Sequence, residues 1–355
     1  MAASSLARNK HDVYIGVDVS KNSYSFTAME ADIMYKARTI PASPEHLYTY
    51  ATKRFPDKNI IFAYEAGPTG YRLYDYLTVK NYGCLVVPPN SIPKASNERV
   101  KNNNIDARKI TQNLQAGQLT SIRVPQGAYR ELRHLIKARE NYAQSRRVAK
   151  QRIKALLLFE SLNDYLKDAD RSWSHRYLES LKTIPCSPAV RSRLDMLLDD
   201  LEYARHHILA SHSTLQAFIK EQPSVQENIG YLRSIPGIGF VTAVSLLGKI
   251  GDPAGLTNVR ELGSFIGLTS RENSTGDTVH RGGISHFGNA YLRFLMVEAS
   301  WVAIRKDAEL HQFYYRIKRR HHPRYASQKA IVAVARKLTH RIYRVLKDKR
   351  MYCIH

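Results

Sequence analysis

The sequence predicts an α/β domain followed by a mostly helical remainder, and three observations support this fold class. Strand and helix patterns alternate along residues 13–119, which is the element order of an α/β layer. Two long patterns with apolar residues at helical spacing follow, at 129–158 and after Pro188. The last stretch combines glycine-punctuated turns with a basic helical tail. We therefore expect three domains, at residues 1–125, 126–225 and 226–355.

Size and charge limit the classes of protein to which this chain can belong. Its 355 residues are 43% hydrophobic, and its formal charge of +23 at pH 7 suits a polyanionic partner. No uninterrupted apolar run is long enough to span a bilayer, and residues 1–12 lack the apolar core of a signal peptide. The three cysteines, Cys84, Cys186 and Cys353, have no zinc-site spacing and fit a reducing cytoplasm.

The first domain is expected to contain a hairpin followed by alternating elements. The stretch "VYIGVDVSKNSYSF" predicts strands at 13–18 and 22–30 that are joined by a tight turn. Apolar runs predict further strands at 58–67 and at "CLVV", where a proline pair ends the strand. Helical spacing with a glycine stop predicts helices at 70–83 and 106–119.

Three acidic residues of this domain occupy positions that packing alone does not explain. Asp18 interrupts an apolar strand, Glu65 closes another, and Asp106 opens a helix. An unpaired charge in a buried strand costs several kcal/mol. Together the three acids can meet at the carboxyl edge of the sheet and bind Mg²⁺, as phosphodiester chemistry requires. The alternative is that each acid pairs with a nearby Lys or Arg, and for the trio we favour the metal site.

The two long helical patterns predict an antiparallel helical arm. The first pattern carries an apolar stripe and a basic remainder that includes Arg146, Arg147, Lys150 and Arg152. The helices either pack against each other within one chain or form a dimerising coiled coil whose basic face holds nucleic acid. The sequence leaves both arrangements open.

The last third carries two candidate nucleic-acid features. Residues 234–252, "SIPGIGFVTAVSLLGKIGD", have the form of a helix-hairpin-helix, whose backbone N–H groups either face a phosphate or only help two helices to pack. A Ser/Thr/Gly-rich loop is expected at 269–289. Residues 305–350 hold fifteen Lys or Arg against three Asp or Glu. This excess, which includes Arg319 and Arg320, indicates a phosphate-binding surface.

Six stretches resemble, in order, the motifs of one known family. They are "IGVDVSK", "YEAGPTG", "RVKNNNIDARKI", "SIPGIGFVTA", "FIGLTSRENSTG" and "GGISHFGNAYLR". Together they run from about residue 13 to 345 and resemble the DEDD-type transposases of the insertion sequence 110 and 1111 group, which includes the pilin-gene invertase. Each motif alone is weak, whereas six in register are specific.

The resemblance implies an architecture, a cofactor and partners. It implies a RuvC-like N-terminal domain of the ribonuclease-H type, a helical coiled-coil arm and a helical C-terminal transposase domain. It also implies Mg²⁺ held by four acids, a serine that becomes linked to a DNA phosphate, and a bridge RNA that pairs with donor and target DNA. Such a protein acts as a dimer or tetramer in the prokaryotic cytoplasm, associated with the nucleoid.

Of the four acidic positions of the family, three hold an acidic residue in this chain and one does not. The first, second and last acids fall on Asp18, Glu65 and Asp106, and the third falls on Asn103. An amide oxygen can bind Mg²⁺ but brings no charge. The expected consequences are weaker metal binding, a partly disabled site, or recruitment of Asn102 or Asn104 instead.

The family's nucleophile falls in the expected 269–289 loop. Aligning on the glycine of "NSTG" puts Thr275 at the family's serine and Ser274 one residue earlier. Either hydroxyl can attack if its pKa is lowered, and Ser274 is favoured slightly as the less hindered primary alcohol. Five basic residues nearby either clamp the scissile phosphate or bind DNA backbone generally, namely Arg271, His280, Arg281, His286 and Arg293.

The favoured function is a mobile-element DNA recombinase that cuts and rejoins strands through a covalent hydroxyl–phosphate intermediate, with Mg²⁺ and a guide RNA. Two alternatives stay open. One is a RuvC-like nuclease that hydrolyses structured nucleic acid with water and needs no hydroxyl in the loop. The other is a degenerate transposase that only binds nucleic acid, which Asn103 keeps open.

Overall fold

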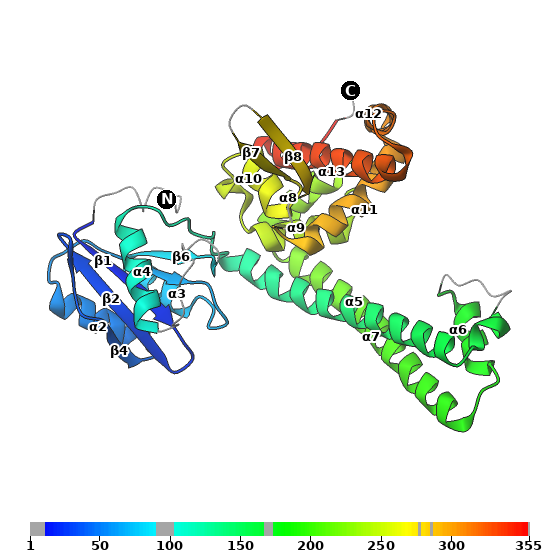
Figure 1. The fold of residues 1–355 in the computed structure, drawn as a ribbon, viewed down its shortest axis with the longest axis horizontal. Helices are drawn as coiled ribbons and strands as arrows, with labels where there is room; N and C mark the ends of the chain where they lie inside the picture. Colours follow the sequence, from blue (N-terminus) through cyan, green and yellow to red (C-terminus); the bar gives the residue numbers. More distant parts are fainter. Residues whose placement is uncertain (1–10, 90–102, 167–172, 276–277, 285–286, 354–355) are drawn as a thin grey trace. The chain divides into compact units, whose positions relative to one another are not determined.

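A computed structural model describes residues 11–89, 103–166, 173–275, 278–284 and 287–353 of the chain (Figure 1). The chain divides into two compact units, Met1–Val124 and Pro125–His355. The first unit is built on a mixed sheet, and the second is almost entirely helical.

The first unit contains a six-stranded sheet whose strands follow the order β3-β2-β1-β5-β6, with β4 also paired to β2. β1 and β2 form the predicted antiparallel hairpin, and β1, β5 and β6 run parallel. The predicted strands and hairpin are therefore confirmed. The strands are β1 (Val13–Val19), β2 (Ser23–Glu30), β3 (Ile33–Met34), β4 (Arg38–Pro41), β5 (Ile60–Glu65) and β6 (Gly83–Val87).

Helices cover both faces of this sheet. On one face, α2 (Pro44–Arg54) and α3 (Arg72–Val79) pack on the alternate residues that include Ile15 and Phe62. On the other face, α4 (Asn103–Gln115) packs on the residues between them, which include Ile61 and Ala63. Strand residues alternate between two faces, so each strand divides its side chains between two helix-covered cores.

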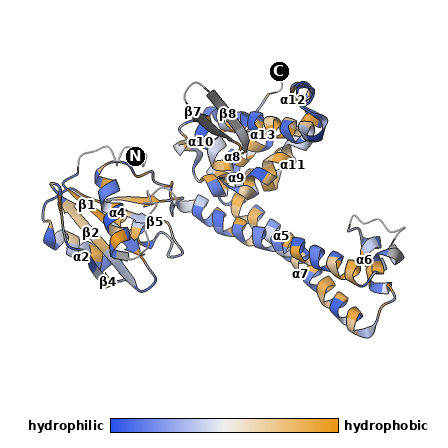
Figure 2. Cartoon of the chain, in the orientation of Figure 1, coloured by the Kyte–Doolittle hydropathy of each residue, from blue (hydrophilic) through white to orange (hydrophobic). Residues whose placement is uncertain are grey.

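The second unit begins with two long helices that lie side by side, α5 (Gly127–Phe159) and α7 (Pro188–Lys220). Figure 2 shows polar and apolar residues alternating along both. Four buried residues of α7 recur every seven positions, namely Leu194, Leu201, Ile208 and Leu215. This is the spacing of a coiled-coil seam, here packed within one chain, and pairing between chains stays a prediction. The short α6 (His175–Thr183) packs at the far end of the pair.

The remainder of this unit is a helical body with one small hairpin. Its core gathers buried residues of several helices, such as Leu246, Met296 and Leu338. Within the described ranges, no helix combines the length and hydropathy needed to cross a membrane. The elements are α8 (Pro223–Arg233), α9 (Phe240–Ile250), α10 (Val259–Ile266), β7 (Ser270–Thr275), β8 (Thr278–Ile284), α11 (Ala290–Lys306), α12 (Ala308–Lys318) and α13 (Pro323–Asp348).

The expected loop at 269–289 is wrong, because most of it forms the antiparallel hairpin β7–β8. Its Ser, Thr and Gly content is typical of loops, and its strands lack a clear apolar alternation. The sequence between the strands, Gly276 and Asp277, belongs to the residue types that two-residue hairpin turns favour. That signal could have identified the hairpin.

Candidate active site and nucleic-acid surface

Asp18 and Glu65 lie next to each other at the carboxyl ends of two neighbouring strands. β1 and β5 are parallel, and their paired register runs as far as Val17 and Tyr64, so Asp18 and Glu65 are the next pair along. Because successive side chains of a strand point to opposite faces of the sheet, both acids lie on the same face as Ala63, which packs against α4. Both are half-buried. The sheet therefore brings these two predicted acids together.

The direction of α4 decides where Asp106 lies. At its C-terminal end, Gln115 Nε2 donates to Asp32 Oδ1, in the turn that follows β2. The end of β2 is paired with the start of β1, because Glu30 is opposite Val13. The helix therefore begins at the opposite end of β1, where Asp18 lies.

The level of Asp106 along the strand follows from one buried contact. The Gly16 N–H donates to Thr111 Oγ1 at 3.0 Å, so this turn of α4 lies over Gly16. Asp106 precedes Thr111 by five residues, which span about 7.5 Å along a helix, and two strand residues from Gly16 to Asp18 span about 6.6 Å. Asp106 thus belongs to the turn of α4 that lies level with Asp18 and Glu65.

The described side chains at this edge do not form a closed metal cage. Among the described residues, no group of three or more His, Cys, Asp or Glu is arranged to hold a metal ion. Neither Glu65 nor Asp106 forms an ion pair with another described residue. For these two acids, pairing with a local Lys or Arg is therefore not observed. Their oxygens are of the kind that Mg²⁺ binds, with one or two carboxylates sufficing.

The asparagine that replaces the third family acid is the first residue of α4. Asn103 thus begins the helix whose first turn holds Asp106, although its side chain lies outside the described residues. Asn102 also lies outside them, and Asn104 is exposed. Carboxylates in a first helical turn are favoured by the helix dipole, which an amide at Asn103 does not exploit.

The candidate nucleophiles lie at the end of one strand of the hairpin. Ser274 is paired with Val279, and Thr275 with Thr278, the first residue of β8. The side chains of both candidates lie outside the described residues, as do those of Arg271, His280 and Arg281. His286 lies outside the described residues altogether. The choice between the two hydroxyls stays open.

Arg293 has a role at the base of this hairpin. Its Nη1 donates to Gly267 O at 3.3 Å and to Phe287 O at 3.4 Å. Gly267 has a φ of 83°, the left-handed conformation that glycine adopts without strain, and it ends α10. Arg293 therefore ties the residues before β7 to those after β8. Contact with DNA stays a prediction for this side chain.

The "SIPGIG" turn joins α8 to α9 and packs against α11. Gly237 has a φ of 90°, and a Cβ at this position would lie 2.9 Å from Ala303 Cβ. This close approach explains the glycine by helix packing. Phosphate binding by the turn stays a prediction.

The predicted basic residues of α5 differ in their surroundings. Arg146, Arg147 and Arg152 are exposed. Lys150 is half-buried, with Nζ 4.9 Å from the centre of the Trp173 ring. Burial, and then the neighbouring Arg146, lower the pKa of Lys150. Lys150 therefore packs on Trp173, whereas the three arginines are presented to solvent.

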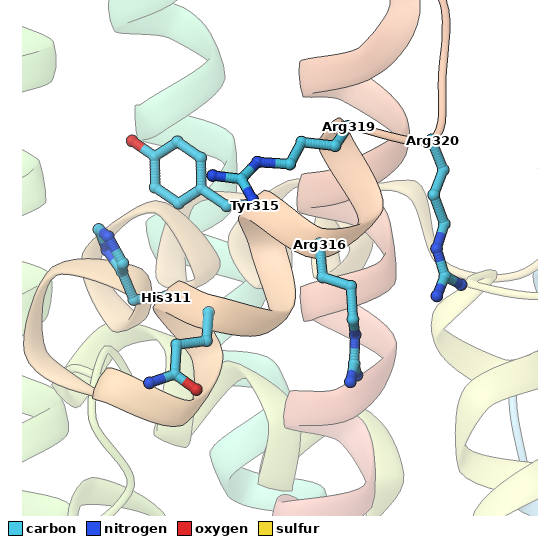
Figure 3. A pocket seen from close by; sticks show the side chains of 6 residues that line it. His311, Tyr315, Arg316, Arg319 and Arg320 are labelled. Atoms are coloured by element: carbon cyan, nitrogen blue, oxygen red, sulfur yellow. The ribbon is translucent and has the colours of Figure 1, made fainter.

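Arg319 and Arg320 belong to an open pocket of about 520 Å³ on α12, shown in Figure 3. Sequence reasoning missed the other residues that line it. Their recurrence three to four residues apart on a helix is the signal that could have found them. The lining residues are His311, Gln312, Tyr315, Arg316, Arg319 and Arg320.

Two families match different parts of the sequence. Residues 15–160 match a family described as "Transposase", the DEDD-type enzymes of IS110, and residues 230–315 match "Transposase IS116/IS110/IS902 family". The transposase of insertion sequence element IS1111A from Coxiella burnetii is 25% identical over 84% of this chain and 80% of its own length. The y4qE protein of Sinorhizobium fredii, named as a proposed transposase, is 29% identical over 82% and 71%. The pilin gene-inverting protein of Moraxella bovis is 29% identical over 37% and 40%.

Proposed function

We propose that this chain, which belongs to the IS110 and IS1111 family of transposases, is a recombinase that cuts and rejoins DNA strands with Mg²⁺. The family supports action on DNA. The observation that carries the metal-dependent chemistry is the pair Asp18 and Glu65, adjacent on parallel strands beneath the first turn of α4. We assign this sheet to the ribonuclease-H type, in which acids at the carboxyl edge serve phosphodiester chemistry.

Asp18, Glu65 and Asp106 would hold Mg²⁺, which when bound lowers the pKa of an attacking hydroxyl and offsets negative charge on the phosphate. The chain's own contribution is to fix those oxygens at one edge and to keep the α4 turn over it through the Gly16–Thr111 contact. Three carboxylates without a fourth acid give a weaker site than the full family set, because Asn103 brings no charge.

The covalent step that we assign uses the hydroxyl of Ser274 or Thr275. As the new oxygen–phosphorus bond forms, the hydroxyl gives up its proton and the bond from phosphorus to a sugar oxygen breaks. The released sugar oxygen takes a proton. A second DNA strand end reverses these events, so strands are rejoined without net hydrolysis. Arginines such as Arg281 are candidates to stabilise the phosphate as charge develops.

RNA guidance and oligomer formation belong to the same proposal. The exposed Arg146, Arg147 and Arg152 offer a positive face on α5 for a bridge RNA or for DNA backbone. The heptad spacing on α7 supports a coiled-coil arm that a second chain can join. Sequencing the RNA that copurifies with the protein tests guidance: one discrete structured species supports it, and a random sample of cellular RNA contradicts it.

The decisive experiment incubates the chain with Mg²⁺ and end-labelled DNA and looks for a covalent protein–DNA adduct. We expect an adduct that maps to residue 274 or 275. Only one of the two single variants, Ser274→Ala and Thr275→Ala, should lose the adduct, and that variant identifies the nucleophile. Asp18→Ala should prevent the adduct while retaining RNA binding. Cleavage without any adduct would instead identify a nuclease that uses water.

Asn103 favours one second candidate, a chain that binds nucleic acid without cutting it. The missing carboxylate removes a charge at the edge where the metal would lie. Strand transfer measured for the natural chain and for Asn103→Asp separates the two candidates. Activity in the natural chain supports a recombinase, whereas activity in the Asn103→Asp variant alone supports the binding protein.

A further inference from the structure

The outer face of α12 combines three arginines with an exposed aromatic ring. The pocket there is lined by residues from one helix and its C-terminal end, and Figure 3 shows their side chains projecting from neighbouring turns. Arg316, Arg319 and Arg320 are exposed. None of these three arginines forms an ion pair with another described residue. Closely spaced, uncompensated cations repel each other, and an anion removes that cost.

The two acidic residues at the start of α12, Asp307 and Glu309, form ion pairs outside the pocket. Asp307 is buried and accepts from Arg341 Nη1 at 2.6 Å, and Glu309 accepts from Arg341 Nη2 at 2.6 Å. Lys337 also pairs with Glu309. Both cationic partners come from α13, so these pairs fasten α12 to the body of the unit. The pocket is thereby left with guanidinium groups and no carboxylate in its lining.

The ring in the pocket is fixed and accessible at the same time. Tyr315 is 43% exposed, and its ring meets the buried Tyr314 edge-on at 5.2 Å between centroids. The centroid of the His311 ring lies 4.8 Å from that of the Tyr315 ring, and His311 Nδ1 is 3.1 Å from Ile304 O. Because a carbonyl oxygen can only accept, Nδ1 donates to it. An exposed aromatic ring held in a basic pocket is suited to stacking with a nucleobase.

We infer that this pocket binds an unpaired nucleotide segment, with a base stacked on Tyr315 and the flanking phosphates held by Arg316, Arg319 and Arg320. Bases in a duplex are already stacked and paired, and only a single strand can turn one toward the ring. The site is built from α12 and is separate from the acid edge and from β7–β8. It rests on the proposed function in that the chain is taken to bind nucleic acid.

Fluorescence anisotropy on the full chain tests the inference with four labelled probes: oligothymidylate, oligouridylate, an abasic strand of equal length, and a duplex. Tyr315→Ala is expected to weaken binding of the oligothymidylate and oligouridylate by about tenfold, while Tyr315→Phe binds like the wild type. The abasic strand and the duplex should be unaffected by either change. A larger loss for oligouridylate than for oligothymidylate assigns the site to RNA, and the reverse assigns it to DNA.

Binding of the base-containing and abasic strands, and its dependence on salt, tests the role of the arginines. Arg316→Gln or Arg319→Gln should weaken the base-containing and abasic strands alike, and should reduce the salt dependence of log K by about 0.7 for each phosphate that the variant no longer binds. Tyr203→Ala is the matched aromatic control, because Tyr203 is 61% exposed on α7 and also packs on a histidine. Arg336→Gln on α13 is the charge control, and both controls should leave the difference between oligothymidylate and duplex unchanged.

Two results would overturn the inference. One is that Tyr315→Ala leaves oligothymidylate and oligouridylate binding unchanged, and the other is that it weakens the duplex and the abasic strand equally. Both results presuppose that the wild-type chain binds nucleic acid. Failure of the wild type to bind any probe would instead remove the proposed function itself, so the two failures are distinguishable.

Discussion

Replacing Gly16 by alanine tests whether the docking of α4 on β1 positions the acid edge. Gly16 faces α4 so closely that an added Cβ would lie 2.5 Å from Thr111 Oγ1 and 2.6 Å from Ala107 O. Real Cβ atoms essentially never approach heavy atoms within 3.0 Å. α4 must therefore move away from the sheet by about 0.5 Å or more, and Asp106 moves with it.

The expected size of the effect follows from this displacement. Overpacking a close contact costs about 1–3 kcal/mol. The Gly16 N–H to Thr111 hydrogen bond, at 3.0 Å, is also stretched or broken, at a net cost of about 1 kcal/mol. Misplacing a reacting group by about 1 Å can cost about a hundredfold in rate. We expect Gly16→Ala to lower strand-transfer activity by about tenfold to a hundredfold while nucleic-acid binding persists.

Hydrogen exchange of the backbone amides supplies the structural readout, because it resolves α4 from the rest of the chain. Amides of residues 103–115 should exchange faster in Gly16→Ala than in the wild type. Gly263→Ala is the control, since nothing lies within 4 Å of a Cβ there and alanine favours the α10 helix. Thr111→Ala should not rescue the variant, because Ala107 O remains in the way. Full rescue, or unchanged exchange with wild-type activity, would refute the reasoning.

Three further changes have defined outcomes. Glu65→Gln should leave the melting temperature unchanged or higher and abolish strand transfer, because no ion pair with a described residue is broken. Arg341→Met should destabilise the second unit by about 3–5 kcal/mol in urea melts, since Asp307 is left buried without its partner, and Asp307→Asn in the same chain should restore most of this stability. Burial raises the pKa of Asp307, but hydrogen bonds from Arg341 and Leu310 N outweigh it and the pKa is lowered. The stability from this pair is therefore fully present above the ordinary value of 3.8 and lost as the pH falls through the lowered pKa, so acid melts of the wild type should show a loss that the double variant lacks.

The meeting of Asp18 and Glu65 was predictable, because the carboxyl ends of parallel strands share one edge of a sheet. Each acid closes or interrupts an apolar run, which the sequence displays directly. The position of Asp106 was less accessible. It depends on how α4 docks, and the contact that decides this joins Gly16 to Thr111, 95 residues apart. Local patterns carry no information about such a pairing.

The sequence-based predictions also missed the helix α2, the β7–β8 hairpin and the role of Tyr315 on α12. The sequence from Ser43 to Glu45 holds a helix start signal, and Ser43 Oγ does accept from His46 N at 3.2 Å, yet the sequence-based expectations include no helix before β5. The β7–β8 hairpin is hard to predict because its strands are rich in polar residues. On α12, the basic excess is evident from the sequence, but the contribution of Tyr315 becomes clear only when the helix places it among the arginines.

Each unit contains a set of like charges that forms no ion pair with another described residue. In the first unit, Glu65 and Asp106 form no ion pair with a described residue, although the chain carries an excess of 23 positive charges. In the second, Asp307 and Glu309 are bound by α13, and the arginines on the outer face of α12 form no ion pair within the described part of the chain. Surface ion pairs contribute little to stability, so leaving these charges unpaired costs the fold little. It leaves the acids available to a cation and the arginines available to phosphate, the two partners that the proposed DNA-rejoining reaction would use.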